Sequence, residues 1–293
     1  MTGKHHFKEI KLPSDIQSCL SGFSSMHTHT VFDDGKDDVE TMCRTAYDKK
    51  MSAIGFSAHV PLEKQINMEC EWILKEENVD GYTTEVHAAK KRWHGKLPVF
   101  FGFEADYIKG RRSPLDSDII ALKPDYLIGS VHFLFPDNDV KPFTVDGSEE
   151  EFDNGLRDGF GGDVKKLMNK YYDAVLEMIY AGGFDILGHA DILKKSTQDK
   201  YPWLQEIENK RQREVGEAAA KTGIVIEVNT GGLNRKKVRD VYPSLSFLKI
   251  FRELNVPVII TSDAHCAKDI DGNYDIALKT LIHAGFREHM LFN

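Results

Sequence analysis

The chain has 293 residues, of which 41% are hydrophobic and 29% charged, and this composition is ordinary for a globular protein with a sizeable core. Its formal net charge of −8 argues against a surface that coats nucleic acid, although bound metal ions can reverse the field locally for an anionic substrate. The sequence contains neither an apolar run of membrane-spanning length nor the apolar core of a signal peptide, so we expect a cytoplasmic protein with no membrane contact.

Short apolar runs rich in β-branched and aromatic residues alternate along the chain with longer stretches of helical periodicity, which is the pattern of repeated βα units. The seven expected strands cover residues 23–28, 53–57, 98–104, 126–131, 184–188, 224–229 and 257–261. The expected helices cover residues 37–50, 83–94, 163–181, 201–222, 244–254 and 274–284. This alternation predicts an α/β fold of the barrel type.

Two charged or Gly- and Pro-containing stretches, residues 61–81 and 133–162, interrupt the alternation, and we expect both to be extended loops that leave the same end of the sheet. Loops of this length in a compact domain are usually functional or disordered. No Ser- or Pro-rich linker divides the chain, so residues 1–293 are expected to form a single domain. The four cysteines show no Cys-x-x-Cys spacing, which indicates reduced thiols and no thiolate zinc site.

Two histidines, His27 and His29, close the first expected strand. Residues i and i+2 of a strand point to the same face, so their imidazoles can converge on one metal ion. A His-x-His pair also occurs by chance at a surface or in a core. Its interpretation therefore depends on the residues at the other strand ends.

Further imidazoles and carboxylates lie at the ends of other expected strands: His59, Glu104, His132, His189, Asp263 and His265. With the first pair, six of the twelve histidines are at strand ends. In a βα barrel these ends converge on one rim, where barrel enzymes build their active sites. Imidazole together with carboxylate suits zinc, manganese or iron. Because one catalytic ion takes about three or four protein ligands, this set predicts two or three divalent metal ions.

These residues belong to short motifs that resemble, in order, those of the polymerase-and-histidinol-phosphatase (PHP) superfamily. The motifs are His27-x-His29 with Asp34-Gly35, Ser57-Ala58-His59, Gly102-Phe103-Glu104, Gly129-Ser130-Val131-His132, Gly188-His189-Ala190-Asp191 and Ser262-Asp263-Ala264-His265. Residues 128–134 and 227–233, followed by Tyr242-Pro243-Ser244, resemble the histidinol-phosphate phosphatase branch in particular.

The resemblance implies a distorted (β/α)7 barrel, in agreement with the seven expected βα units, and up to three metal ions at the carboxyl ends of the strands. In related phosphatases a histidine often stands at the position of Asp34, and the neighbouring Asp33 is a rival ligand. An oxygen ligand there would weaken zinc binding or favour a harder ion such as manganese. The implied ligand sets are His27, His29, Glu104 and Asp263 for the first ion, Glu104, His132 and His189 for the second, and Asp34, His59 and His265 for the third.

The resemblance also implies hydrolysis of a small phosphate monoester, with L-histidinol phosphate as the expected substrate. A water between two ions about 3.5–4 Å apart loses its proton near neutral pH and attacks phosphorus in line. Glu104, Asp263 and His265 are the candidate catalytic residues, and the proton donor is open between the last two. The alternatives are a phosphodiesterase or nuclease, which would need a basic, aromatic-lined groove, and a non-catalytic metal-stabilised module.

Two arginines are candidates for binding the phosphate group. Arg157 is the only arginine between His132 and His189, and Arg235 follows the sixth expected strand. A guanidinium group can form two parallel hydrogen bonds to phosphate. Lys194 and Lys195 are weaker candidates for the same role. An ordinary surface position with weak ion pairs is the alternative for each of these cations.

Overall fold

The computed structural model describes residues 7–13, 22–62, 70–136 and 142–292, and a parallel sheet is its central element. Seven parallel strands lie in the sheet in the order in which the chain forms them. They are β2 (Ser24–Ser25), β3 (Ala53–His59), β4 (Val99–Asp106), β5 (Tyr126–Ser130), β8 (Ile186–Leu187), β9 (Val225–Asn229) and β10 (Val258–Thr261). All seven expected strands are confirmed, although β2 and β8 are reduced to two residues each.

The first and last of these strands lie side by side and close the sheet into a barrel. Beyond the strands, Thr28 forms a parallel bridge with Ala264. The N–H of Ala264 donates to the carbonyl oxygen of His27 at 3.1 Å, and the N–H of His29 donates to that of Ala264 at 2.9 Å. The hydroxyl oxygens of Ser25 and Ser262 are 3.0 Å apart. The fold is thus the distorted (β/α)7 barrel that the sequence predicts.

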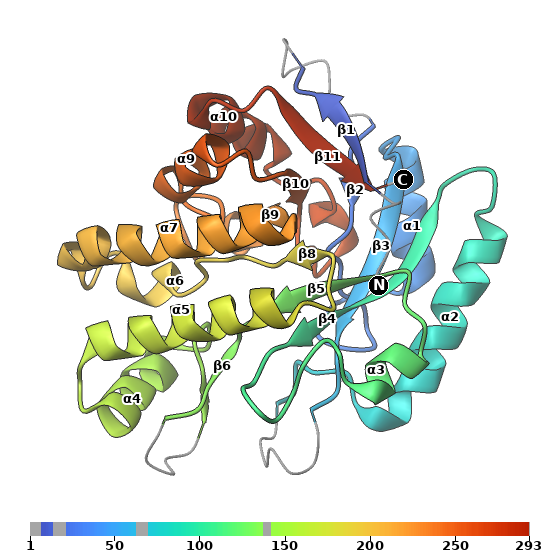
Figure 1. Ribbon diagram of the computed structural model, residues 1–293. Coiled ribbons are helices and arrows are strands. Elements are labelled where there is room, and N and C mark those ends of the chain that lie inside the picture. Colours follow the sequence, from blue (N-terminus) through green and yellow to red (C-terminus); the bar gives the residue numbers. More distant parts are fainter. Residues whose placement is uncertain (1–6, 14–21, 63–69, 137–141, 293) are drawn as a thin grey trace.

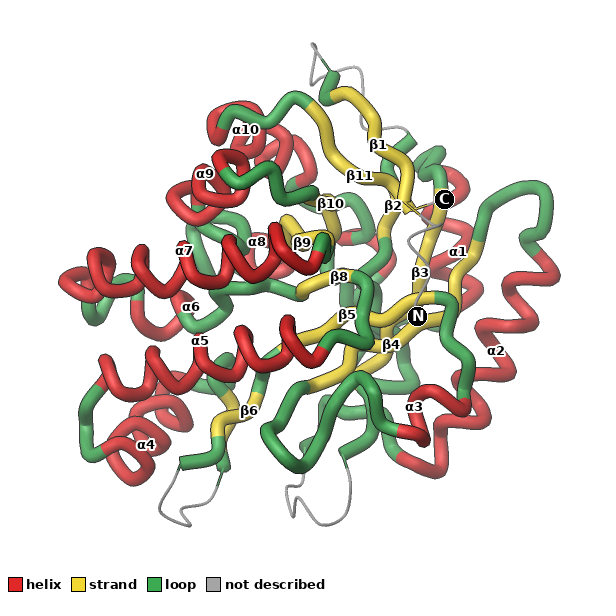
Figure 2. Tube along the Cα trace, in the orientation of Figure 1, coloured by secondary structure: helices red, strands yellow, loops and turns green. Residues whose placement is uncertain are grey.

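Helices surround the strands, as Figures 1 and 2 show. The six predicted helices are confirmed as α1 (Val39–Asp48), α2 (Val79–Arg92), α5 (Val164–Ala181), α7 (Gln205–Thr222), α9 (Leu245–Glu253) and α10 (Tyr274–Ala284). Three short helices, α3 (Ser117–Ala121), α6 (Lys194–Thr197) and α8 (Gly231–Asn234), lie between them. None of the helices in the described part of the chain combines the length and apolar character needed to cross a membrane.

The stretch 133–162 is not the extended loop that the sequence predicts. It forms a small antiparallel pair, β6 (Phe133–Leu134) and β7 (Phe143–Thr144), followed by the helix α4 (Glu149–Phe160). The helix begins where Ser148 Oγ accepts a hydrogen bond from the N–H of Glu151. Phe152, Leu156 and Phe160 recur every four residues and are buried. Of the other expected loop, residues 63–69 lie outside the described residues, and Glu76–Asn78 form one 3₁₀ turn.

Two further strands sit at the amino-terminal end of the barrel. β11 (Glu288–Phe292) pairs in parallel with β10, and β1 (Phe7–Lys11) pairs antiparallel with β11 (Figure 1). The ring of Phe292 packs against those of Phe100 and Tyr126 at centroid distances of 4.8 and 5.2 Å. An apolar cluster of Met26, Ile128, Ile186, Val225 and Ile259 surrounds this contact. The amino-terminal end of the barrel is therefore filled by apolar side chains, and the polar strand ends face the other way.

Candidate metal centre

The barrel brings the predicted ligand residues together at the carboxyl ends of its strands. His59 is the last residue of β3, Glu104 lies two residues before the end of β4, and the two are direct partners in the sheet register. The remaining residues follow β2, β5, β8 and β10 within a few positions. A cavity of about 450 Å³ opens over this rim. The predicted residues that line it are Asp34, His59, Glu104, His132, His189, Asp263, His265 and Arg235.

Glu104 lies at the centre of the cluster and is 1% exposed. Its Oε1 is 2.9 Å from Nε2 of His189 and 3.5 Å from Nε2 of His132. Its Oε2 is 3.1 Å from Nε2 of His27 and 3.1 Å from Nδ1 of His59. The two carboxylate oxygens therefore face two different groups of imidazoles.

Asp263 lies on the other side of His29. Its Oδ1 is 3.4 Å from Nε2 of His29 and 3.5 Å from Nδ1 of His265. The backbone of Asp263 has φ of 47°, a left-handed conformation that is uncommon for residues other than glycine. Such conformations persist where the surrounding structure holds them and are frequent at functional sites. Here the turn directs both Asp263 and His265 toward the cavity.

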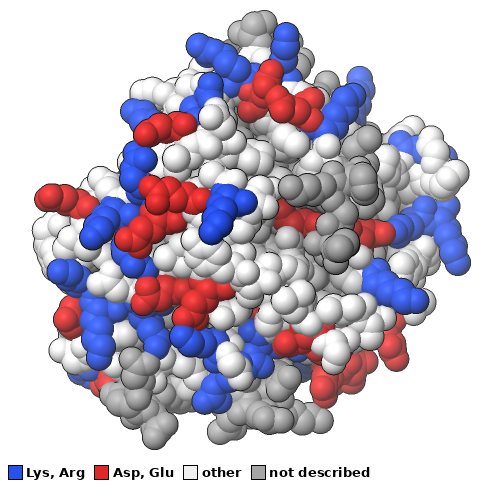
Figure 3. All heavy atoms as spheres, in the orientation of Figure 1, with Lys and Arg blue, Asp and Glu red and all other residues white. Residues whose placement is uncertain are grey.

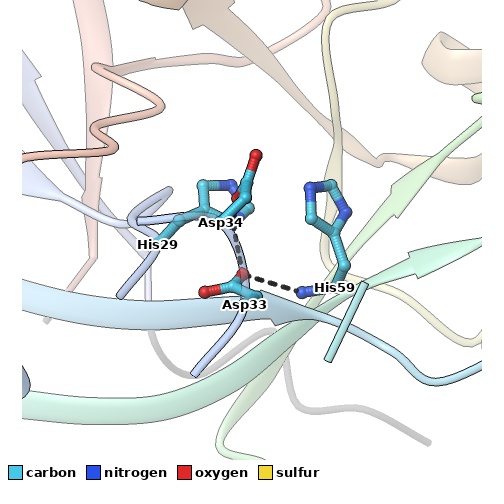
Figure 4. Close-up of side chains that lie close together, drawn as sticks. All are labelled: His29, Asp33, Asp34 and His59. Atoms are coloured by element: carbon cyan, nitrogen blue, oxygen red, sulfur yellow. Dashed lines mark hydrogen bonds and ion pairs between the residues drawn. The ribbon is translucent and has the colours of Figure 1, made fainter. Parts of the chain in front are cut away.

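The structure distinguishes the neighbouring aspartates (Figure 4). Oδ2 of Asp33 accepts hydrogen bonds from Nδ1 of His29 at 2.7 Å and from the backbone N–H of His59 at 3.2 Å. Asp34 lines the cavity, and its Oδ2 is 3.0 Å from Nε2 of His265. The Oδ1 of Asp34 is buried and has no hydrogen-bond partner among the described residues. Asp33 therefore holds His29 and His59 in place through hydrogen bonds, and Asp34 presents its carboxylate oxygens to the cavity.

Three imidazoles of the cluster each donate a hydrogen bond from their outer ring nitrogen to a buried carboxylate. Such pairs fix the tautomer and the orientation of a metal-binding histidine. The sequence interpretation missed two of the carboxylates, Glu227 and Asp106. The alternation of side chains along a strand was the available signal, because it turns Glu227 and Asp106 toward the barrel interior. The pairs are His27 with Glu227 at 2.5 Å, His29 with Asp33 at 2.7 Å and His132 with Asp106 at 3.0 Å.

The donor atoms of the cluster fit metal ions. Nε2 of His29 and Nδ1 of His59 are buried and have no hydrogen-bond partner among the described residues. An unpaired buried polar atom is costly, and coordination to a cation removes that cost. Groups of three or four ligand atoms lie within 4.8 Å of one another, one of them from His59, Glu104 and His132. Mixed nitrogen and oxygen donors suit zinc, manganese or iron.

The electrostatics of the cluster favour the ligand forms of two residues. Burial alone would raise the pKa of Glu104, but the imidazoles of His27 and His59 hold it well below its usual range. Burial lowers the pKa of the His59 imidazole to about 4. At neutral pH Glu104 is therefore a carboxylate and His59 a neutral imidazole, which are the forms that bind metal.

The predicted phosphate-binding cations have different surroundings. Arg235 lines the cavity and donates from Nη2 to Oδ2 of Asp263 at 2.9 Å. Lys195 also lines the cavity. Lys194 is buried and donates to the backbone oxygen of Val241, so its role is structural.

The structure does not place Arg157 in the described lining of the cavity. This residue lies on α4, outside the described lining of the cavity, and its side chain is 65% exposed. Its Nε and Nη2 donate to the adjacent Asp158 at 2.7 and 3.0 Å. The position of Arg157 in the sequence, between two predicted ligands, suggested that it lies near the cavity. The helix α4, which the sequence interpretation missed, directs its guanidinium group to the surface.

The fold and the site define a class of protein: a (β/α)7 barrel that gathers imidazoles and carboxylates at the carboxyl ends of its strands. Residues 25–231 match the PHP domain family. Since this match covers more than half of the chain, the protein belongs to the PHP family.

The chain is similar over most of its length to proteins named for one activity. A Deinococcus radiodurans protein named probable histidinol-phosphatase is 26% identical over 272 residues, which cover 92% of this chain and 96% of the relative. A structure of hisK, a candidate histidinol phosphatase from Listeria monocytogenes, has a TM-score of 0.77 at 23% identity and covers 86% of this chain and 98% of that one. The histidinol phosphate phosphatase of Lactococcus lactis, in complex with zinc, L-histidinol and phosphate, has a TM-score of 0.65 at 19% identity, with coverages of 92% and 97%. These structural likenesses show a shared fold.

Proposed function

We propose that this protein is a metal-dependent phosphatase that hydrolyses L-histidinol phosphate to L-histidinol and phosphate. The observation that carries the proposal is the bridging position of Glu104, whose two oxygens face separate groups of imidazoles beneath an open cavity. The names of the Deinococcus and Lactococcus relatives support the choice of substrate.

Nine residues would hold the ions in this proposal. When bound, two or three ions of zinc, manganese or iron would supply Lewis acidity and an activated water for attack on phosphorus. The contacts of Glu104 support its place between two ions, and those of Asp34 support it over Asp33. The proposed sets are His27, His29, Glu104 and Asp263; Glu104, His132 and His189; and Asp34, His59 and His265.

Residues of the chain itself would handle the phosphate and the leaving group. Arg235 and Lys195 place positive charge along the cavity, where a phosphate dianion is attracted. Arg235 also donates from Nη1 to the backbone oxygen of Asp263 at 3.0 Å, so it holds this turn as well. His265 is partly exposed, in contrast to the buried Glu104, and is within reach of solvent. His265 and Asp263 are the two candidate proton donors to the leaving alkoxide, and the one that donates does not hold an ion at that step.

The face drawn in Figure 3 gives no support to the nuclease alternative. On the face drawn in Figure 3, basic and acidic side chains of the described residues are interspersed and form no continuous basic stripe. A nuclease groove would concentrate positive charge and aromatic side chains along the path of the strand.

A substrate panel tests the proposal. Protein loaded with zinc, manganese or iron is assayed for phosphate release from L-histidinol phosphate and other monoesters, and for cleavage of a single-stranded oligonucleotide. We expect selective turnover of L-histidinol phosphate. Metal binding without turnover of any of these compounds would contradict the catalytic proposal, and preferred cleavage of the oligonucleotide would support the nuclease alternative.

A ligand variant tests the site. His132→Ala removes one imidazole that faces Oε1 of Glu104, so we expect turnover to be abolished while the far-UV circular dichroism spectrum is retained. His94→Ala, an exposed histidine beyond the end of α2, is the matched control and should keep normal activity. Normal activity in His132→Ala would remove this residue from the site.

A further inference from the structure

The cavity has an acidic wall that the proposed metal ligands do not use. Asp146 and Glu151 line it, and both come from the segment between β7 and the first turn of α4. Oε1 of Glu151 accepts a hydrogen bond from Oγ1 of Thr144 at 2.7 Å. The carboxylate of Asp146 accepts no hydrogen bond and forms no ion pair with the described residues. Asp146 therefore presents a free carboxylate in the cavity.

The backbone around Asp146 is fixed on both sides, so the carboxylate has a defined position. The N–H of Val145 donates to the carbonyl oxygen of His132, a proposed ligand, at 2.8 Å. Nζ of Lys195 donates to the backbone oxygens of Asp146 and of Gly147, the latter at 2.9 Å. This segment is thus tied directly to the rim of the barrel.

Two further walls of the cavity are an imidazole and an aromatic ring. His59 lines the cavity, is 6% exposed, and its Nδ1 has no hydrogen-bond partner among the described residues. Trp72 lines the same cavity, with its ring edge-on to His59 at a centroid distance of 4.6 Å and stacked on Phe133 at 5.3 Å. Beside the proposed metal ligands, the cavity therefore has an aromatic wall at Trp72 and a carboxylate wall at Asp146.

The negative charge of this carboxylate wall restricts which phosphate esters the cavity can bind. A phosphate monoester is an anion, and the carboxylate of Asp146 repels it while Lys195 and Arg235 of the same cavity attract it. An ester whose alcohol portion carries a positive charge replaces this repulsion with a charge-assisted hydrogen bond. We propose that Asp146 binds the protonated amino group of the leaving alcohol and thereby selects phosphate monoesters of amino alcohols. This inference deepens the proposed function and rests on the reaction being phosphomonoester hydrolysis at this site.

A matched pair of substrates tests the inference. The metal-loaded protein and Asp146→Asn are assayed with 2-aminoethyl phosphate and with 2-hydroxyethyl phosphate, which differ in the charged amine alone, and with L-histidinol phosphate. We expect Asp146→Asn to lower the ratio of kcat/KM for the amine ester over the hydroxyl ester by about 10- to 100-fold, mainly through KM. Glu150→Gln removes an exposed charge from the first turn of α4, four positions from Asp146, and should leave the ratio unchanged.

Calorimetry gives a second readout that needs no turnover. The Kd of Asp146→Asn for L-histidinol should rise by about 10- to 100-fold, while its Kd for inorganic phosphate should not rise. Equal effects of Asp146→Asn on both esters and both ligands, or no effect on either, would overturn the inference. If the wild-type protein hydrolyses 2-aminoethyl phosphate but not L-histidinol phosphate, the proposed substrate is wrong, and the ratio still decides the role of Asp146.

Discussion

The outer nitrogen of His27 and the carboxylate of Glu227 are 2.5 Å apart, and both side chains are fully buried. The same carboxylate accepts hydrogen bonds from Oγ1 of Thr261 at 2.5 Å and from the backbone N–H of His189 at 2.7 Å. Glu227 thus connects two of the proposed ligand histidines through one side chain. With Nδ1 of His27 as the donor to Glu227, the lone pair of Nε2 is left to face Glu104.

We expect Glu227→Gln to weaken metal binding by about 10- to 100-fold, because an amide neither fixes the donor role of His27 Nδ1 nor raises the basicity of the ring. Chelator competition measures the affinity, and circular dichroism checks the fold. Glu217→Gln, an exposed position on α7, is the control. Unchanged metal affinity in Glu227→Gln would show that this contact does not orient His27 for metal binding.

The position of Asp34 predicts a change in metal preference. A nitrogen donor favours zinc over manganese more than a carboxylate does. We expect Asp34→His to raise the ratio of zinc to manganese affinity by about tenfold or more. Asp33→His should lower affinity for both metals, because it removes the partner of Nδ1 of His29. A shift in preference with Asp33→His alone would reverse the roles of the two aspartates.

Metal affinity should increase with pH. Burial alone would lower the pKa of His29, but Asp33 and Asp263 raise it to about 10, and Asp106 and Glu104 likewise oppose burial to raise the pKa of His132 to about 10. Both imidazoles are protonated at neutral pH without metal, so an ion must displace their protons. We expect affinity to rise from pH 6 to 9, with proton release detectable by calorimetry in buffers of different ionisation enthalpy. Affinity that does not change over this interval would contradict these assignments.

The same pKa shifts give the sign of the stability change without metal. Because the folded pKa values lie above the unfolded value of about 6.5, the paired imidazoles stabilise the metal-free fold fully below pH 6.5. This contribution is lost as pH rises toward 10. Urea denaturation of chelator-treated protein should therefore show a lower free energy of unfolding at pH 9 than at pH 7.

His289 should make the fold sensitive to acid. Its ring is 2% exposed, stacks on Phe23 at 5.0 Å, and has no hydrogen-bond partner for either nitrogen among the described residues. Burial lowers its pKa to about 4, so its contribution to stability is complete above pH 6.5 and is lost as pH falls toward 4. Between pH 7 and 5, this residue alone should lower the free energy of unfolding by roughly 2 kcal/mol.

Urea denaturation of the wild-type protein and of His289→Phe at the two pH values isolates this effect. We expect the variant to lose roughly 2 kcal/mol less than the wild type between pH 7 and 5, because Phe keeps the ring contact and does not titrate. An equal loss in the two proteins would show that the buried imidazole finds a partner on protonation.

The two arginines that the sequence suggested should differ sharply. Arg235→Ala removes a cation from the cavity and the guanidinium partner of Asp263, so we expect kcat/KM to fall by about 10²- to 10³-fold. Arg157→Ala breaks an exposed ion pair and should change kcat/KM by less than about 2-fold. Comparable losses in both variants would place Arg157 in contact with the substrate.

Much of the site could be predicted because the sequence places its polar residues next to strong strand patterns. His59, Glu104 and His132 each end an apolar run, and a parallel barrel converts that shared position into proximity. The choice between Asp33 and Asp34 could not be made in this way. Both lie in one turn, and only the three-dimensional path of the turn shows which carboxylate faces His29 from behind.

The elements that the sequence did not reveal have weaker local patterns. In α4, Gly155 and Gly159 dilute the apolar spacing, and both glycines allow close packing of Phe143 and Pro136. The pattern of β11 is short and mixed, and its place in the sheet depends on pairing with β1 at the other end of the chain. Contacts of such long range leave no periodic signal near either segment.

The closure of the barrel between β2 and β10 determines when, during synthesis of the chain, the proposed ligand set becomes complete. Ser25 and Ser262 meet across 237 positions, so at about 5–20 residues per second the ribosome needs about 10 to 50 s to supply the second edge after the first. His27, His29 and Glu104 are made early, whereas Asp263 and His265 follow β10, the last of the seven barrel strands. A nascent chain therefore carries a partial ligand set through most of its production, and the complete set forms only when the last strand docks beside the first.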